Sequence, residues 1–418
     1  MNVATTSRRS ASVVLFLLLV AYIFNYLDRQ ILGILAGPII GELHLSDRQF
    51  GLLSGPPFAI LYSVLGIPFA FLADRTSRSR VIAAAVAFWS AFTGLCGTAT
   101  SFWQFFVFRM GVGVGEAGGV APSYALIADY FEPRRRARAL AIFSLGVQIG
   151  LSLGTLLGAY IAHAISWRAA FYTMGVAGVL LAPVMLIFVR DVPRPQHPST
   201  APISQVFPMV ASQPVFWLMA FAASSSSLCG YGLAVWTPSI LERSFGLSLI
   251  ERGQFMASVV FIGGCAGVFA GGWFADRLGH LDRGWYAKLP AIAWAITAPT
   301  FVLGFFAPSL WVAWPLLLIP NALNILWLGP VVTAVQHLVP QRMRSTASAS
   351  FLLINNLIGL GVGPYLIGAI STALKQTYGA ESLRYAAATC TVFYLLAALL
   401  MLLCVNKLRS SWVEDHHS

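Results

Sequence analysis

Four charged residues stand inside apolar segments of the N-terminal half of the chain. Residues 108–119, FRMGVGVGEAGG, carry Arg109 and Glu116 seven positions apart, and the segment NYLDRQ carries Asp28 and Arg29. Two acids and two guanidinium groups in apolar surroundings could exchange a proton, hold an anion, or form ion pairs that only fix helix packing. Which chemistry is possible depends on the elements that carry the four residues.

The glycines of the same stretch also match a phosphate-binding pattern. GVGEAG, from Gly113 to Gly118, fits the G-x-G-x-x-G spacing of dinucleotide-binding loops, which follow a strand and open a helix. Here the pattern lies within an apolar run near residues 102–129, and no βαβ unit follows it. We therefore expect these glycines to let helices approach closely in lipid, and we predict no nucleotide site.

The composition is that of a membrane protein. The 418 residues are 58% hydrophobic and 10% charged, whereas about 25% of the residues in a soluble domain are charged. Apolar runs of at least ~18 residues, bounded by charged or Pro/Gly clusters, predict twelve transmembrane helices. The predicted spans lie near residues 12–37, 49–73, 81–99, 102–129, 138–163, 169–189, 214–241, 254–275, 287–306, 310–337, 346–373 and 385–406. The predicted fold class is an all-α membrane protein.

The longest connection divides the chain into two halves. We predict an N-terminal six-helix bundle over residues 1–190, a cytoplasmic linker over 191–213, and a C-terminal six-helix bundle with a short tail over 214–418. The halves repeat a motif, since FLADRTSRSR at 71–80 matches WFADRLGHLDR at 273–283. Two pseudo-symmetric halves with charges at membrane depth are typical of secondary transporters.

The basic residues predict the orientation in the membrane. Most of the 26 Lys and Arg residues fall on the side of the predicted spans that also holds both termini. Six lie on the other side, namely Arg48, Arg168, Arg243, Arg252, Lys375 and Arg384, and Arg29 and Arg109 lie within spans. The positive-inside rule then places both termini in the cytoplasm. The net charge of +11 is explained by orientation and by attraction to anionic membrane lipids, so we predict no nucleic-acid partner.

Helix geometry relates the four charges to one another. Arg109 and Glu116 lie two turns apart on nearly one face of their span. Asp28 falls at a height between them, so it could pair with Arg109 or compete with Glu116 for that cation, while Arg29 points about 100° away from Asp28. Two acids beside flexible basic partners favour a titrating site over a purely structural ion pair. We predict Asp28 and Glu116 as proton carriers, Arg109 as the coupling or head-group residue, and Arg29 as a supporting or gating charge.

The loop after the second predicted span resembles a signature of the major facilitator superfamily. That signature, G-x-x-x-D-R-x-G-R-[KR], appears as AFLADRTSRSR, with Ala and Ser in place of its glycines, and again as GWFADRLGH. The matching residues include Asp74, Arg75, Arg78, Asp276 and Arg277. The resemblance implies the twelve-helix major facilitator fold and alternating access. It also implies that these residues gate the cytoplasmic face by meeting helix N-termini of the opposite half.

Two further segments resemble the spinster-like branch of that superfamily. They are NYLDRQ in the first span and FRMGVGVGEAGGVAPSYALIADYF in the fourth. Members of this branch are linked to lysolipid and sphingolipid export, and proton coupling has been proposed for bacterial relatives. Anion:cation symporters of organic acids share a similar R-x6-E neighbourhood, so the resemblance leaves that substrate class open.

In this fold the substrate cavity is expected mainly from the first, fourth, seventh and tenth spans. The candidate lining residues are polar or aromatic and lie on those spans or on the fifth: Asn25, Arg109, Gln148, Ser224, Ser227, Tyr231, Asn321, Asn324 and Trp327. One wall is charged and the other is apolar and aromatic, which suits an amphiphile with an anionic head near Arg109. Singly, each of these residues could equally serve helix packing.

Together these features predict a proton-coupled secondary transporter for an amphipathic, lipid-like solute, monomeric and resident in a bacterial inner membrane. We expect no cofactor beyond the proton gradient and no metal site, and the five scattered cysteines act as small apolar residues. The alternatives are a polyspecific drug exporter and an organic-anion/proton symporter. A membrane sensor or a lipid-modifying enzyme is more remote, because no nucleophile–His pair or metal-ligand cluster is visible at membrane depth.

Overall fold

The computed structural model describes residues 8–192 and 203–413, and all regular secondary structure within these ranges is helical. The chain forms two compact units. Unit 1 comprises Met1–His197 and Leu247–Ala257, and unit 2 comprises Pro198–Gly246 and Ser258–Ser418.

The predicted spans all fall on helices, although the helices are divided differently. Among the described residues, ten helical segments are long and apolar enough to cross a membrane. One of them, Arg344–Ser411, is 68 residues long and contains two predicted spans. The span predicted at 102–129 is split at a pair of glycines into two helices, neither of which reaches a full crossing by itself. The predicted all-α membrane fold is confirmed.

Unit 1 holds nine helices that are complete within it, and they carry the four charged residues. In chain order they are α1 (Arg8–Ile34), α2 (Ala36–Glu42), α3 (Asp47–Ser54), α4 (Pro56–Arg75), α5 (Arg78–Cys96), α6 (Phe102–Ala117), α7 (Val120–Tyr130), α8 (Pro133–Ala164) and α9 (Trp167–Phe188). Serine caps start several of them. Ser46, for example, accepts from the backbone N–H of Gln49, whose side chain bonds back to Ser46.

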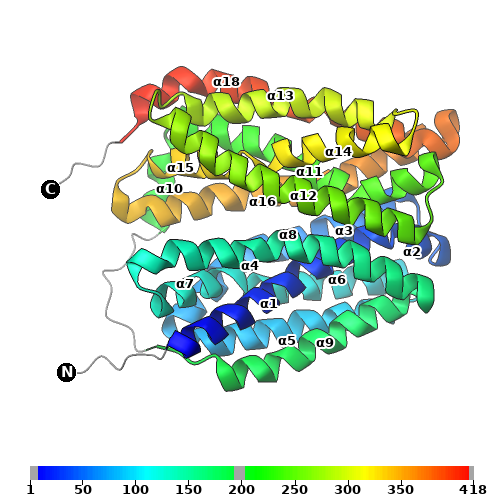
Figure 1. Ribbon diagram of the computed structural model, residues 1–418, viewed down its shortest axis with the longest axis horizontal. Coiled ribbons are helices and arrows are strands. Elements are labelled where there is room, and N and C mark those ends of the chain that lie inside the picture. Colours follow the sequence, from blue (N-terminus) through cyan, green and yellow to red (C-terminus); the bar gives the residue numbers. More distant parts are fainter. Residues whose placement is uncertain (1–7, 193–202, 414–418) are drawn as a thin grey trace. The chain divides into compact units, whose positions relative to one another are not determined.

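The helix that carries Asp28 and Arg29 is held by α8. The two helices lie side by side (Figure 1). Glycines of α8 make this approach possible, because a Cβ at Gly150 would lie 2.5 Å from the carbonyl oxygen of Ile23 and one at Gly154 would lie 2.7 Å from that of Leu27. Close backbone contact through small residues is the usual way in which helices associate in lipid.

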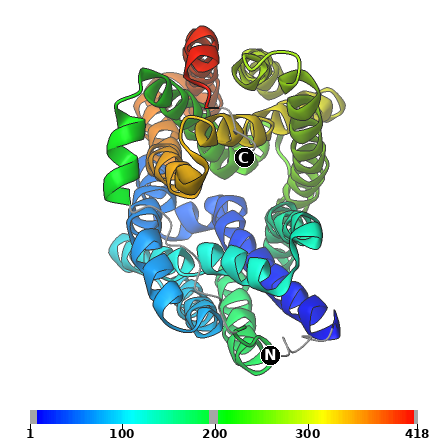
Figure 2. The same ribbon diagram turned by 90° about the vertical axis from the view of Figure 1, so that its left-hand side faces the viewer.

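Glycines set the position of α6 in the same way. A Cβ at Gly113 would lie 2.7 Å from the carbonyl oxygen of Phe58 on α4, and one at Gly115 would lie 2.6 Å from the backbone nitrogen of Trp89 on α5. The helix ends where Gly118 bonds back to Gly115. The stretch that matches a dinucleotide fingerprint is therefore helical as far as Ala117 and packs against two other helices. Figure 2 shows the helices of the chain seen roughly end-on.

Unit 2 is built from the remaining helices. They are α10 (Ile203–Ala211), α11 (Pro214–Phe245), α12 (Leu249–Gly279, whose first residues belong to unit 1), α13 (Trp285–Phe305), α14 (Leu310–Ile325), α15 (Leu328–Gln336), η1 (Gln341–Met343), α16 (Arg344–Tyr378), η2 (Gly379–Glu381), α17 (Ser382–Cys390) and α18 (Val392–Ser411). The core pair is α11 and α16, where the indole of Trp236 donates to the carbonyl of Pro364 at 2.8 Å.

Candidate functional site

The charged residues of unit 1 converge from two helices. α1 contributes Asp28 and Arg29, and α6 contributes Arg109 and Glu116. Three of the four are buried within the unit, with Asp28 1% exposed, Arg109 3% exposed and Glu116 fully buried, and the side chain of Arg29 is 12% exposed.

Glu116 is paired across the bundle with Arg29. The Nε of Arg29 donates to Oε2 of Glu116 at 2.8 Å, and Nη2 lies 2.8 Å from the same oxygen. The guanidinium also lies over three rings, with its carbon 4.9 Å from the centroid of Tyr26, 4.9 Å from that of Phe58 and 4.6 Å from that of Tyr62. A guanidinium stacks on aromatic faces more readily than an ammonium does, so this aromatic box on α1 and α4 suits Arg29.

Arg109 makes no such pair. Within residues 8–192 and 203–413 it forms no hydrogen bond or ion pair, and its contact is with the ring of Phe58, 5.2 Å from the guanidinium carbon. The sequence predicts Arg109 as the cation beside Asp28 and Glu116. In the structure it is Arg29 of α1 that forms the ion pair with Glu116 of α6.

Asp28 is a buried carboxylate with a neutral partner. Its Oδ2 accepts from the hydroxyl of Thr93 on α5 at 3.1 Å, and Oδ1 has no partner in the protein. No cation of the described chain forms an ion pair with it. Of the two acids, Asp28 is therefore the one that would carry an uncompensated charge when ionised.

A small cavity lies one helical turn from the Asp28–Thr93 hydrogen bond. Asn25 is three residues before Asp28 on α1, and Trp89 is four residues before Thr93 on α5, so both face the same way as the bonded pair. Both line the cavity, together with Ala21, Tyr22, Ile82, Gly119, Val120 and Ser123. The amide of Asn25 and the indole N–H of Trp89 are buried without a protein partner. The cavity is therefore polar on two sides, beside a titratable group.

The signature residues lie at helix ends and are mostly exposed. Arg78 pairs with Asp74, N–O distance 2.7 Å, and also with Asp129, which the signature did not indicate. Arg75 lies over Phe71 and Arg277 over Trp273, while Asp276 is exposed. The latch contacts predicted for Asp74 and Asp276 stay predictions.

The other candidate cavity residues are largely engaged in packing within their own units. Asn324 accepts from the hydroxyl of Tyr394 at 2.9 Å, Asn321 donates to Leu317 of its own helix, and buried Trp327 packs near Trp294. Ser224, Ser227 and Gln148 are buried, and Tyr231 is partly exposed. Their roles as substrate contacts stay predictions.

Sequence reasoning missed the neutral partners of the charges. Thr93 and Trp89 stand in the apolar span 81–99, and Phe58 and Tyr62 stand in the span 49–73. The one signal in the sequence was the presence of a polar Thr and an indole within a membrane span. That signal does not give the rotation of the helix about its axis, so it does not show which residues these side chains face.

Comparison with known proteins identifies the family. The model of the Major Facilitator Superfamily matches residues 18–364. The chain belongs to this superfamily. It is therefore a transporter with multiple membrane-spanning helices and not an enzyme.

Three relatives indicate the range of substrates. An MFS-type efflux pump of Mycolicibacterium smegmatis is 32% identical over 363 residues, which cover 86% of this chain and 84% of that protein. The hexuronate transporter of Bacillus subtilis is 26% identical over 381 residues, which cover 87% of this chain and 88% of that protein. The crystal structure of a bacterial homologue of the human lysosomal transporter Spinster, inward-facing and unoccupied, superposes with a TM-score of 0.90 at 29% identity, covering 98% of this chain and 100% of that chain. The predicted resemblance to the spinster-like branch is confirmed.

Proposed function

We propose that this transporter is a proton-coupled secondary transporter that moves an amphipathic organic or lipid-like solute by alternating access. Asp28 and Glu116 carry the protons, Arg109 binds the anionic part of the solute or couples it to the carboxylates, and Arg29 holds or releases Glu116. We further propose that the protein works as a monomer in a bacterial inner membrane, with both termini in the cytoplasm and no cofactor beyond the proton gradient.

The observation that supports proton coupling is the unequal pairing of the charges. Glu116 has a cation partner, whereas Asp28 and Arg109 have none among the described residues. An uncompensated charge at membrane depth costs ~2.5 kcal/mol or more. A proton removes that cost at Asp28, and an anionic solute removes it at Arg109. Proton binding and solute binding therefore both change the net charge of the same buried site, and each can affect the other.

Glu116 supplies the step that couples protonation to movement. Its ion pair joins α1 to α6, and a proton on its carboxylate would remove the attraction for Arg29. Arg29 would then keep only its aromatic contacts. Protonation therefore loosens a connection between two helices, which is the kind of change that a switch between two conformations requires.

The cavity beside Asp28 supports a path for the proton. A polar cavity needs about 10–15 Å³ to hold one ordered water. This cavity, of about 10 Å³, has room for no more than one, and Asn25 and Trp89 offer polar groups to it one turn from Asp28. Water at this position would hydrogen-bond the orphaned amide and indole and bring an exchangeable proton near the carboxylate.

The test of coupling is solute flux in proteoliposomes with an imposed pH gradient. We expect Asp28→Asn and Glu116→Gln each to abolish gradient-driven flux, because neither amide can carry the proton. Glu42→Gln is the matched control, since this half-exposed carboxylate at the end of α2 pairs with Arg168 and should leave flux unchanged. Full gradient-driven flux in both site variants would refute proton coupling.

An organic-anion substrate is the second candidate, supported by the hexuronate transporter among the relatives. The unpaired guanidinium of Arg109 would suit a carboxylate as well as a phosphate. Thermal-shift measurements against lysolipids, sphingoid phosphates and hexuronates separate the two classes. Stabilisation by lysolipids but not by hexuronates supports the lipid-like substrate, and the reverse result supports the symporter.

A further inference from the structure

A groove lies on unit 2 where three helices end. It has a volume of about 440 Å³ and lies between the end of α10, the start of α11 and the end of α18. Its lining residues are Ala211, Ser212, Pro214, Trp217, Leu218, Phe221, Leu400 and Lys407. No acidic residue is among them. The volume falls within the range of small-molecule sites, about 300–1,000 Å³.

The apolar wall of the groove is made of ordered aromatic rings. Trp217 stacks on Phe221, with ring centroids 5.7 Å apart, and meets Phe207 of α10 edge-on at 6.5 Å. The indole N–H of Trp217 donates to the carbonyl of Ala211 at 2.8 Å. The ring is thus held in place with its polar edge satisfied. Phe221 is 46% exposed, so it presents a free face to whatever occupies the groove.

The rim of the groove carries one cation, Lys407. Its ammonium group forms no ion pair or hydrogen bond with any described residue, and the side chain is exposed. The neighbouring Arg409 differs, because Asp282 and Asn406 bind its guanidinium. Lys407 is therefore available to an external anion and Arg409 is not.

The start of α11 adds positive potential beside Lys407. Its cap residue Gln213 makes no capping bond, since its amide donates to the carbonyl of Leu338 instead. The first turn of a helix exposes backbone N–H groups and carries partial positive charge. The groove therefore joins an aromatic, apolar wall to a rim whose one charged side chain is Lys407, beside the start of α11.

We propose that this groove binds an anionic phospholipid, with its phosphate against Lys407 and an acyl chain along Trp217 and Phe221. Charge complementarity selects the lipid, because Lys407 and the start of α11 favour an anionic head group over a zwitterionic one. α10 contributes its last residue, Ala211, to the groove, and its Phe207 supports the ring of Trp217. Its exposed Phe207 and Met209, with Val206 and Val210 buried beneath, suit a helix at the membrane surface.

Native mass spectrometry of the full chain in detergent tests the site. The protein is mixed with equal amounts of phosphatidylglycerol and phosphatidylcholine, and the bound fraction of each is measured. We expect a preference for phosphatidylglycerol that falls about fivefold in Lys407→Gln. The reason is that one lysine near an anionic lipid surface strengthens binding by about this factor. Lys407→Arg should keep the preference.

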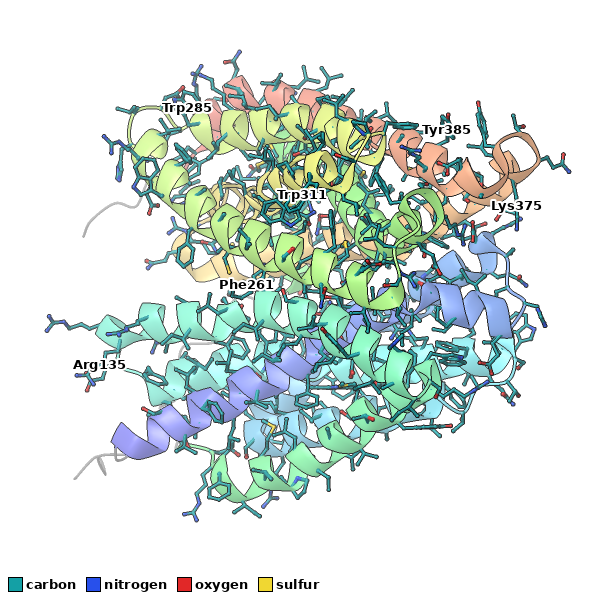
Figure 3. The ribbon with its side chains drawn as sticks, turned by 45° about the vertical axis from the view of Figure 1, so that its right-hand side comes forward. Arg135, Phe261, Trp285, Trp311, Lys375 and Tyr385 are labelled. Carbon is teal, nitrogen blue, oxygen red and sulfur yellow. The ribbon has the colours of Figure 1, made fainter. Side chains whose placement is uncertain are left out.

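Lys375→Gln is the matched control. This exposed lysine ends α16 at the end of unit 2 opposite Trp285 (Figure 3), far from the groove, and should leave the preference unchanged. Phe221→Ala should lower the bound fraction of both lipids, because it removes an apolar contact for the acyl chain and leaves the charge of the groove unchanged. If Lys407→Gln and Lys375→Gln lowered the preference for phosphatidylglycerol equally, the proposal would be overturned. Displacement of the lipid by soluble glycerol phosphate would also overturn it, because the groove would then bind the anion without the acyl chain.

Discussion

Arg29 and Arg109 have the same side chain and both lie inside unit 1, yet they have different partners. Arg29 joins Glu116 within an aromatic box, while Arg109 lies against Phe58 and has no charged partner in the described chain. The difference arises from where each helix places its Cα. It divides the four charges into one compensated pair and two uncompensated charges, and our proposed coupling depends on that division.

The value of the Arg29–Glu116 pair can be measured at this scale. Removing one partner of a buried ion pair leaves an unpaired charge and costs about 3–5 kcal/mol, so Arg29→Gln should lower the thermal stability strongly. The double variant Arg29→Gln/Glu116→Gln should recover most of the loss, because no charge is then left unpaired. Thermal unfolding in detergent provides the measurement.

Lys288→Gln serves as the control for this cycle. Lys288 pairs with Asp282 at 3.3 Å in a partly exposed position, where an ion pair contributes at most about 1 kcal/mol. If the double variant were as unstable as Arg29→Gln, the pair would not be the cause of the loss.

The sequence predicted the four buried charges but not how they pair. Charges in apolar spans have to face inward, so Asp28, Arg29, Arg109 and Glu116 could be found from composition alone. Pairing depends on helix rotation and side-chain reach, which are fixed by contacts between helices. Thr93 could not be recognised for the same reason, since a lone Thr in a span more often serves packing.

At the scale of the helices, glycines decide how closely α6 approaches its neighbours. The same residues that resemble a nucleotide fingerprint place the backbone of α6 against α4 and α5. The break at Gly118 and Gly119 could not be predicted, because the run of residues 102–129 is long enough for one span and its glycines are compatible with a continuous helix. The positions of Arg109 and Glu116 therefore depend on glycine packing.

Gly115→Ala should destabilise the protein by about 1–3 kcal/mol, because overpacking shifts the backbone. Its Cβ would lie 2.6 Å from the backbone nitrogen of Trp89, which cannot move aside easily. Gly66→Ala on α4 is the control, since a Cβ there meets nothing within 4 Å. Thermal unfolding of the two variants compares them, and equal stability would show that α6 is not held by this contact.

The connection between α12 and α13 predicts a pH effect. Asp282 accepts from Arg409, from the backbone N–H of Gly284 and from Lys288. These donors, Arg409 above all, hold the pKa of Asp282 below its ordinary value of 3.8. A lowered pKa contributes stability that is present above the unfolded value and is lost as the pH falls through the folded one.

Asp282→Asn should therefore lower the unfolding temperature most at neutral pH, and the difference from the unchanged protein should shrink below about pH 4. Unfolding curves between pH 3 and pH 7 provide the measurement. Glu132→Gln is the control, because Glu132 is exposed and forms no ion pair with any described residue. A difference that stays constant over this pH range would contradict the assignment.

At the scale of the whole molecule, the sequence predicted the class of protein well and its chemistry in part. Composition and the repeated D-R motif sufficed for a membrane transporter of the major facilitator superfamily. The substrate depends on a few side chains whose surroundings change during alternating access. Relatives that transport different solutes share this fold, so the fold cannot select among them.

The central claim is that solute movement carries protons through Asp28 and Glu116. The most direct measurement is the internal pH of proteoliposomes, reported by an enclosed pH-sensitive dye, after a solute gradient is imposed without any pH gradient. We predict that the solute gradient changes the internal pH in the unchanged protein. We predict no change with Asp28→Asn/Glu116→Gln, although solute exchange at equal concentrations persists. An equal pH change in that double variant would contradict the account.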